Sequence, residues 1–139
     1  MQSDTRIPPI STKRLWAGRI ISGLPALLLL LDAVMKFIKP APVVQETVRL
    51  GYAESAIIPI GIVLLVCTVL YLIPRTAVLG AILLTGYLGG AVSTHVRMAE
   101  GWFAIVFPVV FGAILWLGLY LRDDRLRSLI PVRKEEIQP

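Results

Sequence analysis

The sequence contains few of the residues from which redox and metal sites are usually built. Cys67 is the only cysteine and His95 the only histidine among 139 residues. A single cysteine excludes an internal disulfide, a Cys-x-x-Cys redox pair and a cysteine metal cluster within one chain. One histidine with scattered carboxylates matches no common metal site, so no bound metal is expected. If the protein holds haem, His95 is the only histidine that can ligate the iron.

A single basic patch is also lacking, although the formal net charge is +5. The lysines and arginines lie between and outside apolar runs instead of forming one patch with aromatic residues among them, so we do not expect a nucleic-acid partner. A signal-peptide cleavage site is lacking too, because the first apolar run leads into Asp32, Lys36 and Lys39 instead of small residues. We therefore expect the first helix to stay in the mature protein.

Hydrophobic residues, in contrast, make up 56% of the chain, against about 45–50% in soluble domains. Uncharged stretches at 55–74, 76–94 and 101–121 approach the roughly 20 residues that cross a bilayer as a helix. The uncharged part of the first run, 20–31, is shorter, but Arg19 and Lys36 can extend to the two interfaces. The sequence predicts an all-α integral membrane four-helix transmembrane bundle, with helices at about 15–38, 55–74, 76–96 and 102–121.

Four spans leave both ends of the chain on one side of the bilayer. That side carries ten lysines and arginines, eight in the tails 1–14 and 122–139 together with Arg19 near the start of the first helix and Arg75 in the short turn, and the other side carries four. The positive-inside rule then places both termini in the cytoplasm. The outer loop, 39–54, is the longest connection. It can hold a short amphipathic helix at 42–50 that ends at Gly51 and covers the bundle as a lid.

Small residues recur along the third predicted helix at four-residue spacing and include a Gly-x-x-x-Gly pair. Such a face lets helix backbones approach closely in lipid. We therefore expect this helix to lie centrally, to contact most of the other helices and to support a homo-oligomer. The residues assigned to this packing are Ala81, Thr85, Gly86, Gly89, Gly90 and Ser93.

Asp32 is the most unusual residue of the first helix, because it follows a run of five leucines. At about 1.5 Å per residue it lies roughly 9 Å inside the helix end. A carboxylate at this depth costs several kcal/mol unless it has a partner. Lys36 lies four residues later, the favourable order for an ion pair on one helix face. The pair is either catalytic or a structural link between helices.

The topology brings further polar residues to the same outer side. They suggest a pocket with a floor of leucines and the 39–54 loop as its roof, suited to a lipophilic small molecule with a polar head, such as a quinone. Asp32 and His95 are the candidate catalytic acid/base residues. Taken singly, the charged residues near the surface also suit contacts with lipid headgroups. The candidate ligand-binding residues are Lys36, Arg97, Glu54 and Glu100.

Several motifs together resemble the DoxX-like small bacterial membrane proteins over about residues 15–132. They are Arg19-Ile-Ile-Ser-Gly-Leu-Pro, Asp32-Ala-Val-Met-Lys36, Leu50-Gly-Tyr-Ala-Glu-Ser55, Leu70-Tyr-Leu-Ile-Pro-Arg-Thr76, Gly86-Tyr-Leu-Gly-Gly-Ala-Val-Ser-Thr-His-Val-Arg97 and Leu119-Tyr-Leu-Arg122.

The resemblance implies a four-helix bundle in the bacterial inner membrane. More distantly, it implies a link to subunits of thiosulfate:quinone oxidoreduction and of membrane oxidoreductase complexes, and so to redox partner subunits. Within these motifs the resemblance points to Asp32 and Lys36 of the first helix and to His95 and Arg97 at the end of the third.

Three hypotheses follow. In the first, the outer pocket binds a lipophilic molecule such as a quinone, and the protein is a small subunit or partner of a membrane redox system. In the second, the protein is a structural membrane interaction protein that assembles through the small-residue face of its third helix. In the third, it is an integral-membrane isomerase or hydrolase that acts on a hydrophobic substrate and uses Asp32 and His95 as its acid/base pair.

Overall fold

The computed structural model describes residues 9–129, which are helical nearly throughout and contain no strand. Four of its helices are long and apolar enough to cross a membrane, which confirms the predicted all-α bundle of four spans. In chain order the elements are α1 (Thr12–Ile38), α2 (Ala41–Arg49), the 3-10 turn η1 (Glu54–Ala56), α3 (Ile57–Leu72), α4 (Ala77–Arg97), α5 (Trp102–Arg122) and α6 (Asp124–Leu129).

Local sequence signals explain where the first two helices begin and end. The Ser11 side chain caps α1 by accepting a hydrogen bond from the backbone N–H of Arg14. At the other end Lys39 adopts a left-handed conformation and Pro40 follows, so α1 cannot continue. Gly51, with a φ of 85°, lies just beyond α2. The break at Lys39 and Pro40 therefore separates α1 from the short helix α2, and the turn at Gly51 follows the end of α2.

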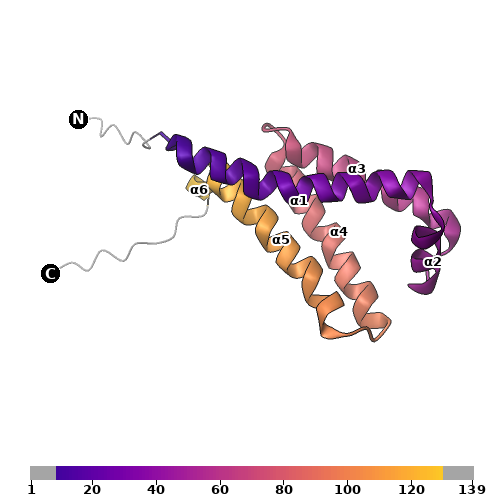
Figure 1. Ribbon diagram of the computed structural model, residues 1–139. Helices are drawn as coiled ribbons and strands as arrows, with labels where there is room; N and C mark the ends of the chain where they lie inside the picture. Colours follow the sequence, from indigo (N-terminus) through magenta and orange to yellow (C-terminus); the bar gives the residue numbers. More distant parts are fainter. Residues whose placement is uncertain (1–8, 130–139) are drawn as a thin grey trace, which may run out of the picture.

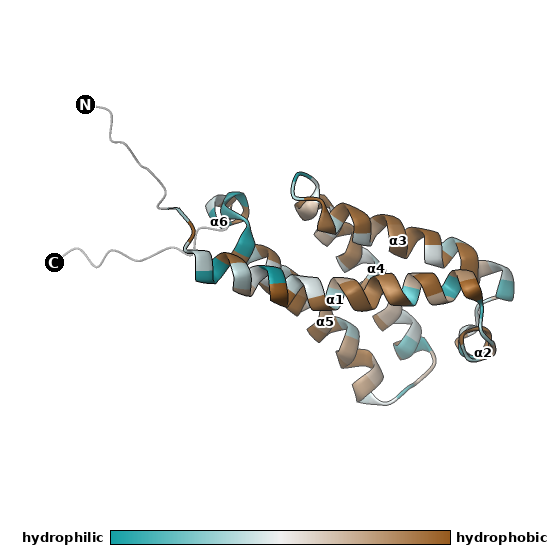
Figure 2. Cartoon of the chain, turned by 45° about the horizontal axis from the view of Figure 1, so that its top comes forward, coloured by the Kyte–Doolittle hydropathy of each residue, from teal (hydrophilic) through white to brown (hydrophobic). Residues whose placement is uncertain are grey.

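The four long helices form a ring in which each packs mainly against two others. α1 packs against α3 and α5, and α4 packs against the same two helices from the opposite side. Figures 1 and 2 show α4 and α5 diverging from α1 toward the end of the bundle that carries α2. α4 is thus one member of the ring, and the prediction that it is the central helix was wrong.

Close helix contacts occur at glycines other than the predicted ones. A Cβ on Gly80 of α4 would lie 2.2 Å from the backbone nitrogen of Tyr71 in α3, and one on Gly118 of α5 would lie 2.6 Å from that of Ser22 in α1. No other element lies within 4 Å of a Cβ built on Gly86, Gly89 or Gly90, which had been expected to contact other helices. These three glycines therefore bring no two helices of this chain together.

The two ends of the bundle differ in structure. We call the end with α2 and the α4–α5 turn the α2 end, and the end with the start of α1, the α3–α4 turn and α6 the α6 end (Figure 1). Apolar residues cover the middle of the long helices, and hydrophilic residues collect toward both ends (Figure 2). The first part of the predicted tail 122–139 contains the helix α6. This helix packs on the bundle, because its residue Leu126 is buried in the core. The remainder of this tail, and residues 1–8 of the other predicted tail, lie outside the described residues.

Candidate functional site

A pocket of about 1140 Å³ opens between the long helices at the α2 end, where α4 and α5 diverge from α1. Its walls are mostly apolar. They comprise side chains from all four spans, among them Leu28, Leu29, Ile60, Val63, Leu88, Phe107 and Phe111. Pockets of small-molecule sites are usually lined in this way, with a few polar groups that fix the orientation of the ligand.

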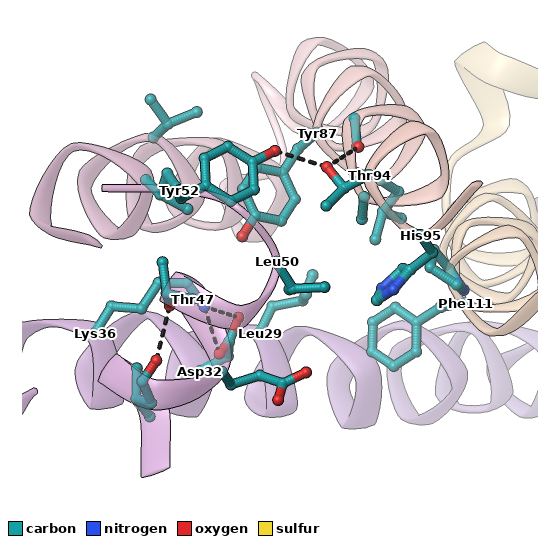
Figure 3. A pocket seen from close by; sticks show the side chains of 18 of the residues that line it. Leu29, Asp32, Lys36, Thr47, Leu50, Tyr52, Tyr87, Thr94, His95 and Phe111 are labelled. Atoms are coloured by element: carbon teal, nitrogen blue, oxygen red, sulfur yellow. Dashed lines mark hydrogen bonds and ion pairs between the residues drawn. The ribbon is translucent and has the colours of Figure 1, made fainter. Parts of the chain in front are cut away.

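Asp32 and Lys36 form the ion pair that their spacing predicted, and both line this pocket. The ammonium group of Lys36 lies 2.6 and 2.7 Å from the two carboxylate oxygens of Asp32 (Figure 3). Gly61 of α3 provides the space for Lys36, because a Cβ on that glycine would lie 3.0 Å from the Cβ of the lysine. The Lys36 side chain is 14% exposed and that of Asp32 is 48% exposed, so the carboxylate faces the open space.

α2 forms a lid over the pocket and is attached to the end of α4. The hydroxyl groups of Tyr52 and Thr94 lie 2.6 Å apart in a hydrogen bond (Figure 3). Arg97 donates a hydrogen bond of 2.8 Å to the carbonyl oxygen of Leu50 and lies over the Tyr52 ring. These contacts hold the segment that follows α2 in place. Thr47 of α2 itself lines the pocket.

A second attachment of the lid consists of Arg49, Glu100 and His95, which we call the latch. Glu100 lies in the α4–α5 turn, with one carboxylate oxygen 2.5 Å from Arg49 and the other 2.5 Å from Nδ1 of His95. The hydrogen bond from Arg49, followed by that from His95, lowers the pKa of Glu100. The pKa of Glu46 is also lowered, mainly by its hydrogen bond with Arg49. The ion pair between Arg49 and Glu100 therefore stays charged at neutral pH.

The six predicted polar site residues divide into two groups. Asp32, Lys36 and His95 line the pocket. Arg97 and Glu100 hold the lid, and Glu54 lies near Lys39 at a distance of 4.0 Å, outside the pocket lining. Asp32 and His95, proposed as an acid/base pair, share no hydrogen bond within residues 9–129, because Lys36 and Glu100 are their respective partners.

The small residues of α4 that were assigned to helix packing have different surroundings: some lie in the core, some line the pocket and some are exposed. Ala81 is buried in the core, and the Thr85 hydroxyl accepts a hydrogen bond from Nε1 of Trp116. Gly86 and Gly90 line the pocket. Gly89 and Ser93 are exposed. The stripe thus includes part of a pocket wall as well as residues that face outward.

Tyr87 is one of the polar pocket residues that the sequence reasoning missed, together with Glu46, Thr47, Tyr52 and Thr94. The Tyr87 side chain projects from α4 into the pocket (Figure 3), and its hydroxyl makes no hydrogen bond to any of the described residues. A signal was present in the sequence, because Tyr87, Ala91 and His95 follow one another at four-residue spacing. All three line the pocket.

Comparison with known proteins agrees with this architecture. The model of the DoxX-like family matches residues 20–118, which is well over half of the chain. No curated protein and no solved structure matches this chain. With four helices able to cross a bilayer and a family match across all four, this multi-pass membrane protein belongs to the DoxX-like family.

Proposed function

We propose that the pocket at the α2 end binds a lipophilic small molecule with a polar head group, such as a quinone, that enters from the bilayer. The observation that carries this proposal is the position of the Asp32–Lys36 pair in a mostly apolar pocket. An ionisable pair at membrane depth that faces an open cavity usually serves a ligand or ion path. A head group would bind near the pair, and an apolar tail would lie along the leucines of α1.

The hydrogen-bonding groups of the pocket suit a ligand with carbonyl oxygens. An ammonium group has three donor hydrogens, and Lys36 uses two of them if it donates to both Asp32 oxygens. The Tyr87 hydroxyl is free to donate, given that no described residue is its partner. His95 binds Glu100 through Nδ1, which leaves Nε2 for a proton exchange with a ligand. A quinone carbonyl accepts hydrogen bonds, so Lys36 and Tyr87 are its proposed donors.

The size of the pocket also suits such a ligand. Small-molecule pockets usually measure about 300–1,000 Å³, and this one, at about 1140 Å³, has space for a ring and part of a tail. Gly86 and Gly90 carry no side chain that would occupy this space. A flat ring can therefore lie against the backbone of α4.

We place the protein in the bacterial inner membrane as a small subunit or partner of a redox system, with both termini in the cytoplasm and the lid on the outer side. In this arrangement a partner subunit supplies or removes the electrons, and this chain binds the quinone and positions the groups that exchange protons with it. The family match supports the membrane-protein class, and the excess of basic residues on the side of the two tails supports the orientation.

Direct binding measurements test this proposal. A short-tailed ubiquinone is titrated into the purified protein in lipid nanodiscs, with wild type, Asp32→Asn and His95→Ala compared. Asp32→Asn weakens the hold on Lys36, the proposed donor to the quinone, and His95→Ala removes the ring that faces the ligand. Each variant should therefore bind the quinone about tenfold more weakly. Glu54→Gln is the control, because Glu54 lies at the same end but outside the pocket lining. Equal affinity in all four proteins, or no binding in any, would contradict the proposal.

A second candidate function is assembly through α4, supported by the exposed positions of Gly89 and Ser93. Among residues 9–129, no other element lies within 4 Å of a Cβ built on Gly89. Small exposed faces of this kind let two membrane helices approach closely. If the protein forms a homo-oligomer through this face, Gly89→Leu should make it monomeric in cross-linking experiments. An unchanged cross-linking pattern would count against this assembly.

A further inference from the structure

The structure contains a second, smaller pocket at the α6 end, which is lined by four arginines from four different elements. Arg19 comes from α1, Arg75 from the α3–α4 turn, Arg122 from α5 and Arg125 from α6, and the pocket measures about 370 Å³. We propose that this pocket binds the phosphate group of a phosphate ester, as in the head group of an anionic phospholipid. It shares no lining residue with the pocket at the α2 end, so this inference is independent of the proposed function.

The charge balance of the pocket favours an anion. Its lining includes four arginines and two carboxylates, Asp123 and Asp124, which gives 4 − 2 = +2. Both carboxylates have other partners. Asp123 accepts a hydrogen bond of 2.9 Å from the backbone N–H of Arg125, and Asp124 lies 3.5 Å from the guanidinium of Arg127.

No carboxylate among the described residues neutralises the charge of three of the four arginines, one of which, Arg19, lies over the ring of Trp16. Within residues 9–129, no carboxylate lies within 4.0 Å of the guanidinium groups of Arg19, Arg75 or Arg125. Guanidinium groups bind phosphate with two parallel hydrogen bonds, which makes arginine the preferred residue for this anion. Several arginines around one small pocket can therefore share a single phosphate.

Arg122 gives the pocket a fixed wall. One of its terminal nitrogens donates a hydrogen bond of 2.8 Å to the carbonyl oxygen of Tyr71, and its guanidinium lies 4.9 Å from the centre of the Tyr71 ring. Gly18 of α1 leaves space for the α5 backbone here, because a Cβ on this glycine would lie 2.8 Å from the backbone nitrogen of Arg122. This arginine is thus positioned before any ligand arrives, which reduces the entropy lost on binding.

The location of the pocket favours a lipid as the source of the phosphate. It lies at the end of the spans, where the apolar middle of the helices gives way to hydrophilic residues (Figure 2). Its lining combines the arginines with apolar residues, including Leu15, Ala77 and Leu119. A lipid head group can bind the arginines while its acyl chains stay in the bilayer. Clusters of basic residues at a membrane surface attract anionic lipids in this way.

Native mass spectrometry of lipid binding tests this inference. Wild type, Arg19→Gln, Arg75→Gln and the double variant are compared for binding of phosphatidylglycerol and phosphatidylcholine. Each arginine removed should weaken phosphatidylglycerol binding about fivefold. Lys13→Gln is the matched control, because it removes one positive charge from an exposed position at the same end, outside the pocket lining. Arg127 is unsuitable, since its partner Asp124 lines the pocket. Arg122 is left intact because it also binds Tyr71.

Excess glycerol phosphate in the same experiment identifies the source of the phosphate. Phosphatidylglycerol binding that survives the competitor indicates a lipid site, and displacement indicates a site for soluble phosphate esters. The inference is overturned if the variants bind phosphatidylglycerol like wild type, if Lys13→Gln weakens it as much, or if phosphatidylcholine binds equally well. Thermal unfolding of each variant verifies its fold, and Arg75→Gln, in an exposed turn, suffices if the double variant does not fold.

Discussion

Arg49, the last residue of α2, lies 2.5 Å from Glu100 in the turn between α4 and α5, so an ion pair fastens the lid to the bundle. The other oxygen of the same carboxylate binds His95, which lines the pocket. Glu100 thus connects the lid to a pocket residue. A change of charge at Glu100 should affect both the position of α2 and the hydrogen bonding of His95.

The first prediction concerns the latch. Glu100→Gln keeps the size of the side chain but removes the charge that binds Arg49 and His95, so α2 should open more often. Backbone amides of α2 should then exchange with deuterium a few times faster than in wild type, while those in the middle of α1 should not change. Glu54→Gln is the control, since Glu54 is not part of the latch. Equal exchange of α2 in wild type and Glu100→Gln would show that the latch does not hold the lid.

The second prediction concerns pH. The folded state lowers the pKa of Glu100 from its ordinary value of 4.5, so the unfolded state binds protons more readily as pH falls. The stabilisation from the latch is therefore fully present above about pH 4.5 and is lost as pH falls through the folded pKa. After correction for the intrinsic pH dependence of amide exchange, the opening of α2 should be constant near neutrality and should become more frequent in acid. Glu100→Gln should show a weaker rise, and an identical rise in both proteins would contradict this assignment.

The third prediction concerns the close contact between α3 and α4. Gly80→Ala places a methyl group where Tyr71 backbone atoms already lie, so helix packing must shift. Overpacking of this kind costs typically about 1–3 kcal/mol of unfolding free energy. Gly89→Ala adds the same methyl group to the same helix where no other element lies within 4 Å, and it should not destabilise the protein. Urea unfolding in detergent compares the two variants, and equal stabilities would contradict this packing.

The fourth prediction separates two tyrosines near the pocket. Tyr52→Phe removes the hydrogen bond to Thr94 and should cost about 1 kcal/mol of stability. Tyr87→Phe removes a hydroxyl that has no partner among the described residues, so stability should stay the same and quinone affinity should fall about fivefold. Thermal unfolding and quinone titration of both variants measure this contrast. A destabilised Tyr87→Phe with unchanged affinity would exclude the proposed role of Tyr87.

Much of the fold could be predicted from the sequence, because the signals involved are local. The apolar stretches identified four spans, and Gly51 marked the end of α2. The Asp32–Lys36 pair could be predicted from four-residue spacing on one helix. Each of these inferences needs only the periodicity of a helix or the thickness of a bilayer.

The remainder depends on contacts between segments far apart in the chain. Small residues on α4 indicated a face that another group can approach, but not whether that group is a helix, a ligand or lipid. The observed close contacts involve Gly80 and Gly118, which no repeated spacing had singled out. The partners of Glu100 likewise depend on how α2 folds back over α4. Periodicity contains no information about such tertiary contacts.

The most direct test of the ligand-binding account compares two glycines of α4. Gly90 lines the pocket and Gly89 does not, and a Cβ on either would have no other element within 4 Å. Gly90→Leu should fill part of the pocket and Gly89→Leu should leave it open, so the pair separates ligand binding from effects on the helix itself. The decisive measurement is the affinity of a short-tailed ubiquinone for both variants in nanodiscs. The account predicts that Gly90→Leu loses binding while Gly89→Leu binds like wild type, and equal affinities in the two variants would contradict it.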